Sequence, residues 1–279
     1  MSGDPDRRRT LLEPLSASAQ RASGKSVTQF MKGITLTTIN YQNLTAVLVH
    51  AAWADASSWN KVTALLLERG LSVRAAQIPL TSLGEDVAAL KGLLRQVDGP
   101  VLLVGHSYAG AVVTAAGADN PQVKALVYIA AIVPDEGETV GALFHRAEPQ
   151  PSTRPQLAPD LGGFLWLPPG AFANAVAPDA SREETALMDI NQHPIALKCL
   201  GEPISPAAWK QKPSWFLVAE KDRMISPDTQ RFMAKRIKAT IRSFGVDHTP
   251  LASAPESVAR VIVEAAEAMR RLAVQSSGS

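Results

Sequence analysis

The stretch "VLLVGHSYAG", residues 101 to 110, decides the fold of this chain. Its apolar start, together with Pro100, predicts a buried strand at 100–104, and a helix is expected at 107–118. A tight strand-to-helix turn lifts the residue at its apex above the edge of the sheet, beside the free N–H groups of the helix. Ser107 occupies this apex and is a candidate nucleophile, with a helix N-cap as its alternative role.

The segments on either side alternate between the same two patterns. Short β-branched or apolar runs, separated by amphipathic segments, predict an α/β fold with a mainly parallel central sheet and helices on both faces. Strands are expected at 44–50, 71–77, 100–104, 123–131, 214–220 and 239–246, and helices at 57–70, 84–97, 107–118, 227–238 and 254–272.

The alternation breaks at Pro134. Residues 135–212 are rich in Pro and Gly and contain only short helical pieces, which favours a helical lid (cap) insertion over more sheet. The α/β core is therefore expected at 33–134 and 213–273. Residues 1–32 are interpreted as a disordered or leader segment, and residues 274–279 as a flexible tail.

Composition and charge favour a globular protein. The 279 residues are 46% hydrophobic and 19% charged, with a formal net charge of +2, which is ordinary for a globular domain. Basic residues are scattered apart from Arg7-Arg8-Arg9, so we expect no nucleic acid and no membrane partner. The small-molecule substrate that we expect follows from the candidate site described below. No apolar run reaches the roughly 18 residues of a membrane span, and a cytoplasmic location is predicted. The oligomeric state stays open, a homodimer included.

Cysteine and histidine usage argues against a metal centre. The single Cys199 excludes an intrachain disulfide and a cysteine-rich metal site, and is interpreted as a small core residue. His145 and His193 fall in the expected lid without the spacing of metal ligands, although either could contact substrate. We therefore expect no metal.

A nucleophilic serine needs a base that takes its proton and a carboxylate that orients the base. His248 follows the last expected strand, and Asp222 follows the strand before it. Ser107, Asp222 and His248 are thus all expected at the carboxyl ends of strands, where the sites of open α/β sheets form. The competing carboxylates are those of Asp135, the runner-up, Asp228, which fits a helix start, and Asp247, which adjoins His248.

The chain from about 44 to 273 resembles the α/β-hydrolase superfamily, and most closely its bacterial esterase-like members with the motifs H-G-A-W-x-D-G-S-S-W and G-H-S-Y-G-G. The corresponding segments here are "HAAWADASSW" at 50–59 and "GHSYAG" at 105–110. The likeness extends to "LTSLGEDVAAL", "ALVYIAAIVPDEGE" and "PSWFLVAEKDRMISPDTQRFMAKR". It implies a cofactor-free fold with a lid and a Ser-His-Asp site.

The resemblance also implies supporting roles. The backbone N–H groups of Ala52 and Tyr108 would form an oxyanion hole, His50 would shape the loop that carries Ala52, and His106 would fill the turn. The sequence departs from the pattern by placing Ala for Gly at 51, 56 and 109, and position 51 matters most because Gly allows backbone angles that Ala reaches less easily. Candidate walls of the substrate pocket are Trp53, His50, Phe164, Trp166, Leu167 and Phe172.

These features predict a serine hydrolase of the esterase type that cleaves a small, largely apolar ester or related acyl substrate through an acyl-enzyme. Ser at 107 argues against the haloalkane dehalogenases and epoxide hydrolases, which resemble this fold but place Asp at the turn. Two alternatives stay open. One is a hydroxynitrile-lyase-like enzyme, for which Lys221 would be the accompanying lysine, and the other is a non-catalytic receptor for small ligands.

Overall fold

The computed structural model describes residues 43–149 and 154–277. The expected leader at 1–32 lies outside the described residues. The last helix, α9 (Pro255–Ser277), runs beyond the expected start of the tail at 274. Its extension has a simple cause, because no Gly or Pro interrupts the sequence before Gly278.

The core is one parallel sheet of six strands, which confirms the predicted fold class. The strand order is β2-β1-β3-β4-β7-β8, and every neighbouring pair is parallel. The strands are β1 (Thr45–Val49), β2 (Ser72–Ala76), β3 (Val101–His106), β4 (Val123–Ile129), β7 (Ser214–Ala219) and β8 (Thr240–Phe244). The chain leaves β1 toward β2 on one side and returns to β3 on the other, so a crevice is expected where β1 and β3 end.

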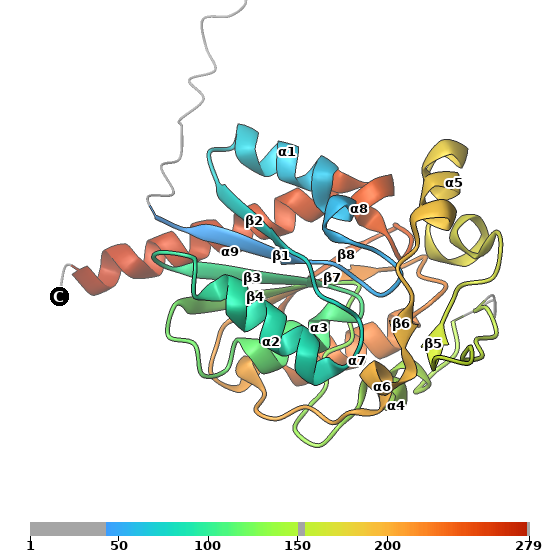
Figure 1. Cartoon of the computed structure of the whole chain (residues 1–279). Coiled ribbons are helices and arrows are strands. Elements are labelled where there is room, and N and C mark those ends of the chain that lie inside the picture. Colours follow the sequence, from blue (N-terminus) through green and yellow to red (C-terminus); the bar gives the residue numbers. More distant parts are fainter. Residues whose placement is uncertain (1–42, 150–153, 278–279) are drawn as a thin grey trace, which may run out of the picture. The chain divides into compact units, whose positions relative to one another are not determined.

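Helices cover both faces of the sheet (Figure 1). One face carries α1 (Asn60–Glu68) and α9, and the other carries α2 (Leu83–Leu94), α3 (Ala109–Ala116) and α7 (Pro227–Arg236). Strand β3 is buried along its whole length, and its side chains alternate between the two layers. Leu102 and Val104 pack with α9, whereas Val101 and Leu103 pack with α2 and α3. Each such buried side chain contributes about 1.5–3 kcal/mol.

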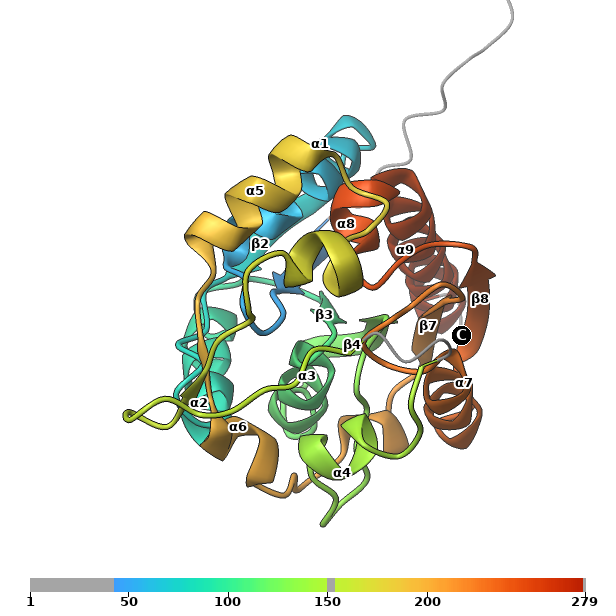
Figure 2. The ribbon, with the colours of Figure 1, turned by 90° about the vertical axis from the view of Figure 1, so that its right-hand side faces the viewer.

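The segment between β4 and β7, residues 130–213, is called the insertion below. It lies over the carboxyl ends of the sheet strands (Figures 1 and 2). Its helices are short, as expected, but it also contains an antiparallel pair of its own, β5 (Phe164–Leu165) with β6 (Ile195–Ala196). Strands of two residues are too short to produce a periodic pattern. The remaining elements of this insertion are α4 (Val140–Phe144), η2 (Phe172–Val176), α5 (Arg182–Asn191), α6 (Leu197–Gly201) and η3 (Ala208–Lys210).

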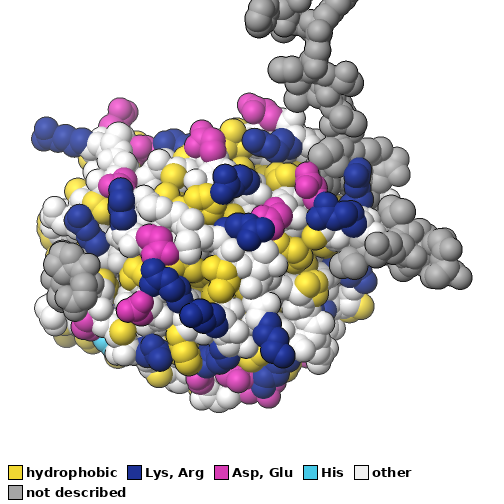
Figure 3. Space-filling model, turned by 180° about the vertical axis from the view of Figure 1, so that it is seen from behind, with side chains coloured by type: hydrophobic (Ala, Val, Ile, Leu, Met, Phe, Trp, Pro, Cys, Tyr) yellow, Lys and Arg dark blue, Asp and Glu magenta, His cyan; other side chains and the backbone are white. Residues whose placement is uncertain are grey.

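The surface carries charges of both signs. On the face seen from behind, Lys and Arg side chains are spread over the molecule with Asp, Glu and apolar side chains among them (Figure 3). In the described part of the chain, no helix combines the length and the apolar character that a membrane span requires.

Candidate active site

The turn between β3 and α3 holds Ser107 in a left-handed conformation. Its φ is +53°, a region that L-residues other than Gly enter at a cost of roughly 1–2 kcal/mol. Three backbone hydrogen bonds hold this conformation: the Ser107 N–H donates to Ile129 O (3.1 Å), and Ser107 O accepts from the N–H groups of Gly110 and Ile132 (3.0 Å each). The hydroxyl therefore stands at the carboxyl end of β3, above the sheet.

Close packing around this turn requires Gly at 105 and 110, but not at 109. A Cβ at Gly105 would lie 2.7 Å from Ala109 O, and one at Gly110 would lie 2.3 Å from Ile132 O. Ala109 itself is fully buried and fits without displacing the turn. The departure from the G-x-S-x-G pattern therefore leaves the geometry of the turn intact.

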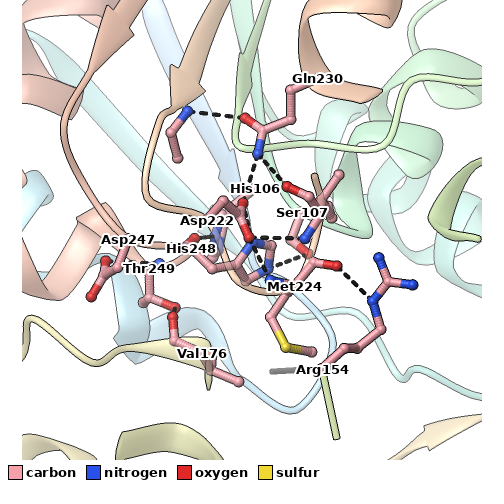
Figure 4. A network of polar contacts seen from close by, with 12 residues as sticks. His106, Ser107, Arg154, Val176, Asp222, Met224, Gln230, Asp247, His248 and Thr249 are labelled. Atoms are coloured by element: carbon pink, nitrogen blue, oxygen red, sulfur yellow. Dashed lines mark hydrogen bonds and ion pairs between the residues drawn. The ribbon is translucent and has the colours of Figure 1, made fainter. Parts of the chain in front are cut away.

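A chain of hydrogen bonds links Ser107 to a histidine and a carboxylate (Figure 4). His248 Nε2 lies 2.9 Å from Ser107 Oγ, and His248 Nδ1 lies 2.7 Å from Asp222 Oδ2. An ionised carboxylate has no proton to donate, so the hydrogen bond to Asp222 requires the proton on His248 Nδ1. His248 Nε2 is then free to accept a hydrogen bond from the serine hydroxyl. All three side chains are buried.

The Asp222 carboxylate is held in place by further donors. Its Oδ1 accepts the N–H groups of Met224 (2.7 Å) and Ile225 (2.8 Å), and its Oδ2 also accepts from Gln230 Nε2 (2.7 Å). Such donors stabilise the charged form of a buried carboxylate. Gln230 was not found from sequence, yet it falls on the apolar face of α7, in register with Met233 and Ala234. A polar residue on an otherwise apolar helix face was the feature of the sequence that could have identified Gln230.

The other carboxylates have different partners. Asp135 pairs with Lys210 Nζ at 2.7 Å, and Asp228 pairs with Arg231 at 2.8 Å. Asp247 is buried and accepts from the N–H groups of Asp179 (2.9 Å) and Thr249 (3.1 Å). Of the four carboxylates weighed from the sequence, the structure places Asp222 beside the imidazole of His248.

The side chain of His106 holds the backbone of His248 in place. Its Nε2–H donates to His248 O (2.8 Å). Burial, together with the neighbouring His248, lowers the pKa of His106 to about 3, so this ring stays neutral. His106 thus fixes the backbone of the residue that bonds to Ser107.

The loop after β1 carries Ala52. Among the described residues, neither the backbone N–H of Ala52 nor that of Tyr108 has a hydrogen-bond acceptor. The left-handed residue of this loop is Trp53 (φ +58°) and not Ala51, so the loop does not need Gly at 51. The indole of Trp53 donates to Leu165 O (2.9 Å) and connects the loop to the insertion.

His50 requires a correction to the expected pocket. It is fully buried, its Nδ1–H donates to Ala51 O (3.0 Å), and its Nε2 accepts the Ile78 N–H (3.0 Å). Burial lowers the pKa of His50, consistent with a neutral ring. His50 therefore braces the loop that carries Ala52, and it is not among the residues that line the cavity beside His248.

The side chain of Tyr108 is held in place by the buried carboxylate of Asp86. Its hydroxyl donates to Asp86 Oδ2 (2.6 Å), while Asp86 Oδ1 accepts the Leu80 N–H (2.7 Å). Burial raises the pKa of Asp86 to about 6, and burial with the nearby Asp86 carboxylate raises the pKa of Tyr108. Cys199 contacts the same carboxylate at 3.8 Å, as a buried core residue.

A cavity of about 350 Å³ opens beside His248. Of the expected pocket residues, Trp53 and Phe172 line it, whereas Phe164, Trp166 and Leu167 do not. Trp166 is 47% exposed and donates to Asp160, and Leu167 belongs to the same buried apolar cluster as Phe172. The sequence did not identify the walls contributed by Val176, Leu187 and Met188, because their segment lacks a clear periodic pattern. Within residues 43–149 and 154–277, no cluster of His, Cys, Asp and Glu could hold a metal ion.

Comparison with known proteins shows that the chain is similar to hydrolases. The model of the family described as the alpha/beta hydrolase family matches residues 46–261. A protein of Arabidopsis thaliana named as a chloroplastic methylesterase is 24% identical over 94% of this chain and 79% of its own length. A carbendazim-hydrolysing esterase of Nocardioides sp. (strain SG-4G) is 34% identical over 42% of this chain and 52% of its own length.

Solved structures share the fold. A pyrethroid hydrolase from Sphingobium faniae JZ-2 superposes with a TM-score of 0.70 at 21% identity and covers 81% of this chain and 98% of its own. Polyneuridine aldehyde esterase gives a TM-score of 0.70 at 18% identity, with 80% and 99% covered.

Proposed function

The chain belongs to the alpha/beta hydrolase family, and from that premise we propose that it is a serine hydrolase of the esterase type, acting on a small, largely apolar ester. The observation that carries the proposal is the hydrogen-bonded chain from Ser107 through His248 to Asp222. The names of its relatives, which include esterases, support the same class of reaction.

In the first half of the cycle, His248 Nε2 takes the proton of Ser107 as Oγ attacks the ester carbonyl. Asp222 holds the imidazole in the required tautomer and stabilises the imidazolium that forms. The negative oxygen of the tetrahedral intermediate faces the N–H groups of Ala52 and Tyr108, and one such donor is worth about 10²–10³ in kcat.

The acyl-enzyme forms when the protonated His248 gives its proton to the leaving alcohol oxygen as the C–O bond breaks, which completes the first half. A water molecule then enters, loses its proton to His248 and attacks the acyl-enzyme. Collapse of this second intermediate returns the proton to Ser107 Oγ and releases the carboxylic acid.

The alternative chemistry of a hydroxynitrile lyase gains no support from Lys221. Its side chain is 63% exposed, and its Nζ lies 3.6 Å from Asp179 Oδ2. The residue that follows His248 is Thr249, whose hydroxyl donates to Val176 O (3.2 Å). Neither residue brings a positive charge to the serine.

Acid release from short-chain alkyl esters, followed by titration at constant pH, tests the proposal. We expect turnover by the wild-type chain and none by folded Ser107→Ala. Cyanide release from mandelonitrile without ester turnover would favour the lyase, and ligand binding without any turnover would favour a receptor.

A further inference from the structure

The cavity beside His248 is larger than a methyl or ethyl alcohol needs. Its volume of about 350 Å³ is about ten times the ~30 Å³ that one water molecule occupies. It falls at the lower end of the ~300–1,000 Å³ typical of small-molecule sites. This space therefore fits a group of the size of an aromatic ring.

The position of the cavity indicates which half of an ester, the acyl group or the alcohol group, it would hold. Ala52 and His248 both line the cavity, whereas Ser107 is not among its lining residues. The proposed mechanism requires the oxyanion to face Ala52 and the leaving oxygen to face His248 Nε2, since His248 must protonate that oxygen. The acyl group has no such need to meet the imidazole. A group that fills the cavity is thus the one bonded to the leaving oxygen.

The wall beyond His248 is preformed. Thr249 and Leu251 continue the wall along the chain, and the Thr249 hydroxyl donates to Val176 O at 3.2 Å, which joins this loop to the insertion (Figure 4). The buried Asp247 carboxylate adds a second link through the Asp179 N–H at 2.9 Å. Preformed walls lower the entropic cost of binding an apolar group.

The chemistry of the walls selects an uncharged apolar group. Trp53, Phe172, Val176 and Met188 line the space, together with polar residues that include Asp55, Asn60 and Asn191. The Lys61 and Glu184 side chains, at its rim, pair with each other at 2.5 Å, so their charges are already neutralised. Asp55 in the wall accepts the Ser57 N–H and carries the remaining charge, so an anionic alcohol would lose its hydration here and meet a like charge.

We propose that this cavity binds the alcohol portion of the ester, and that this portion is a bulky, uncharged, apolar group such as an arylmethyl alcohol. The proposal rests on the proposed esterase function. It assigns Met188, on α5, as a residue that determines specificity for the leaving group.

Two isomeric esters separate the two halves of the substrate. Benzyl acetate carries its ring on the alcohol side, and methyl phenylacetate carries its ring on the acyl side. We expect wild-type kcat/KM for benzyl acetate to exceed that for methyl acetate by at least tenfold. Equal or slower cleavage of benzyl acetate would overturn the proposal.

Substitutions at Met188 test the location of the ring. Met188→Trp fills the cavity and should lower the ratio of kcat/KM for benzyl acetate to that for methyl phenylacetate by at least tenfold. Met188→Ala should raise the same ratio for the larger pair, 1-naphthylmethyl acetate and methyl 1-naphthylacetate. The matched control is Ile190→Trp on the same helix, 78% exposed and outside the cavity, which should leave the ratio within twofold of wild type.

Each outcome has a defined meaning. A loss by Met188→Trp confined to methyl phenylacetate would show that the cavity holds the acyl group, and an equal loss or no loss for both isomers would show that it separates neither half. Either result overturns the proposal. Labelling of Ser107 by a fluorophosphonate identifies the other kind of failure: an unlabelled serine in folded protein contradicts the esterase function itself, whereas a labelled serine without selectivity contradicts only the assignment of the cavity.

Discussion

The carboxylate of Asp222 receives hydrogen bonds from one imidazole, two backbone N–H groups and the Gln230 side chain. An amide at 222 could accept the backbone donors but would present a donor or a weaker acceptor to His248, which would favour the wrong tautomer. We expect Asp222→Asn to lower kcat by about 10⁴. Steady-state kinetics on a short-chain ester would measure this loss.

The matched control for that substitution is Asp135→Asn. Asp135 pairs with Lys210 and does not contact His248, so kcat should stay within twofold of wild type. A mild effect of the substitution at 222 together with a severe effect of the substitution at 135 would mean that Asp135, in the loop after β4, is the carboxylate that orients His248.

Because the pKa of Asp86 is raised in the folded chain, its contribution to the free energy of unfolding falls as pH rises. An aspartate of the unfolded chain titrates near 4 (about 3.9), whereas burial raises the pKa of Asp86 to about 6 in the folded chain. Between these values the folded state binds more protons, so the contribution of Asp86 to the free energy of unfolding falls as pH rises from about 4 to about 6 and stays constant above that.

Urea unfolding of wild type and Asp86→Asn across this pH range tests the linkage. The difference in unfolding free energy, wild type minus variant, should decrease between pH 4 and pH 6 and level off above pH 6. Parallel profiles for the two proteins would mean that Asp86 does not titrate in this window.

At the scale of elements, the turn between β3 and α3 depends on close contact of two backbones. A methyl at Gly105 would lie 2.7 Å from Ala109 O and 3.0 Å from Val113 Cγ2, and the backbone oxygen cannot move without disturbing α3. We expect Gly105→Ala to lower the free energy of unfolding by about 1–3 kcal/mol and to slow fluorophosphonate labelling of Ser107. Chemical denaturation measures the first effect.

Gly92→Ala is the matched control for this contact. Gly92 lies within α2, where the added methyl would meet only Arg95 Nη2, at 3.7 Å. There the same substitution should raise the unfolding free energy by about 0.4–1 kcal/mol. Equal effects at 92 and 105 would show that crowding at the turn is unimportant.

The elements that could be predicted from sequence are those buried on both sides. Strands such as β3 and β7 read as continuous apolar runs, and their positions differ from expectation by only a few residues. Helix α3 begins at Ala109 instead of 107, because Ser107 and Tyr108 form the turn. The pair β5 and β6 could not be predicted, since its two-residue strands depend on pairing across the insertion.

The whole molecule brings the candidate site together through distant contacts. Ser107 and His248 are 141 residues apart, and Trp53 reaches Leu165 across 112 residues. Chain order and strand ends suggested the candidate residues Ser107, Asp222 and His248, but neither could reveal how Asp86 anchors Tyr108 or which residues of the insertion line the cavity. These features arise from tertiary packing, which the periodicity of a single segment does not encode.

The link between the loop after β1 and the insertion can be tested in the whole protein. Trp53→Phe keeps an aromatic ring at this position but removes the indole N–H that donates to Leu165 O, and should lower the unfolding free energy by about 0.5–1.5 kcal/mol. Hydrogen exchange should show faster exchange in β5 and β6 than in wild type. Unchanged protection there would mean that this bond does not hold the insertion in place.

The central claim, that Ser107 is an activated nucleophile in spite of Ala109, is tested most directly by intact-mass labelling with a fluorophosphonate, wild type beside Ser107→Ala. The predicted result is a single adduct on the wild-type chain, located at Ser107, and none on the folded variant. No adduct on folded wild type, or an equal adduct on Ser107→Ala, would contradict the claim.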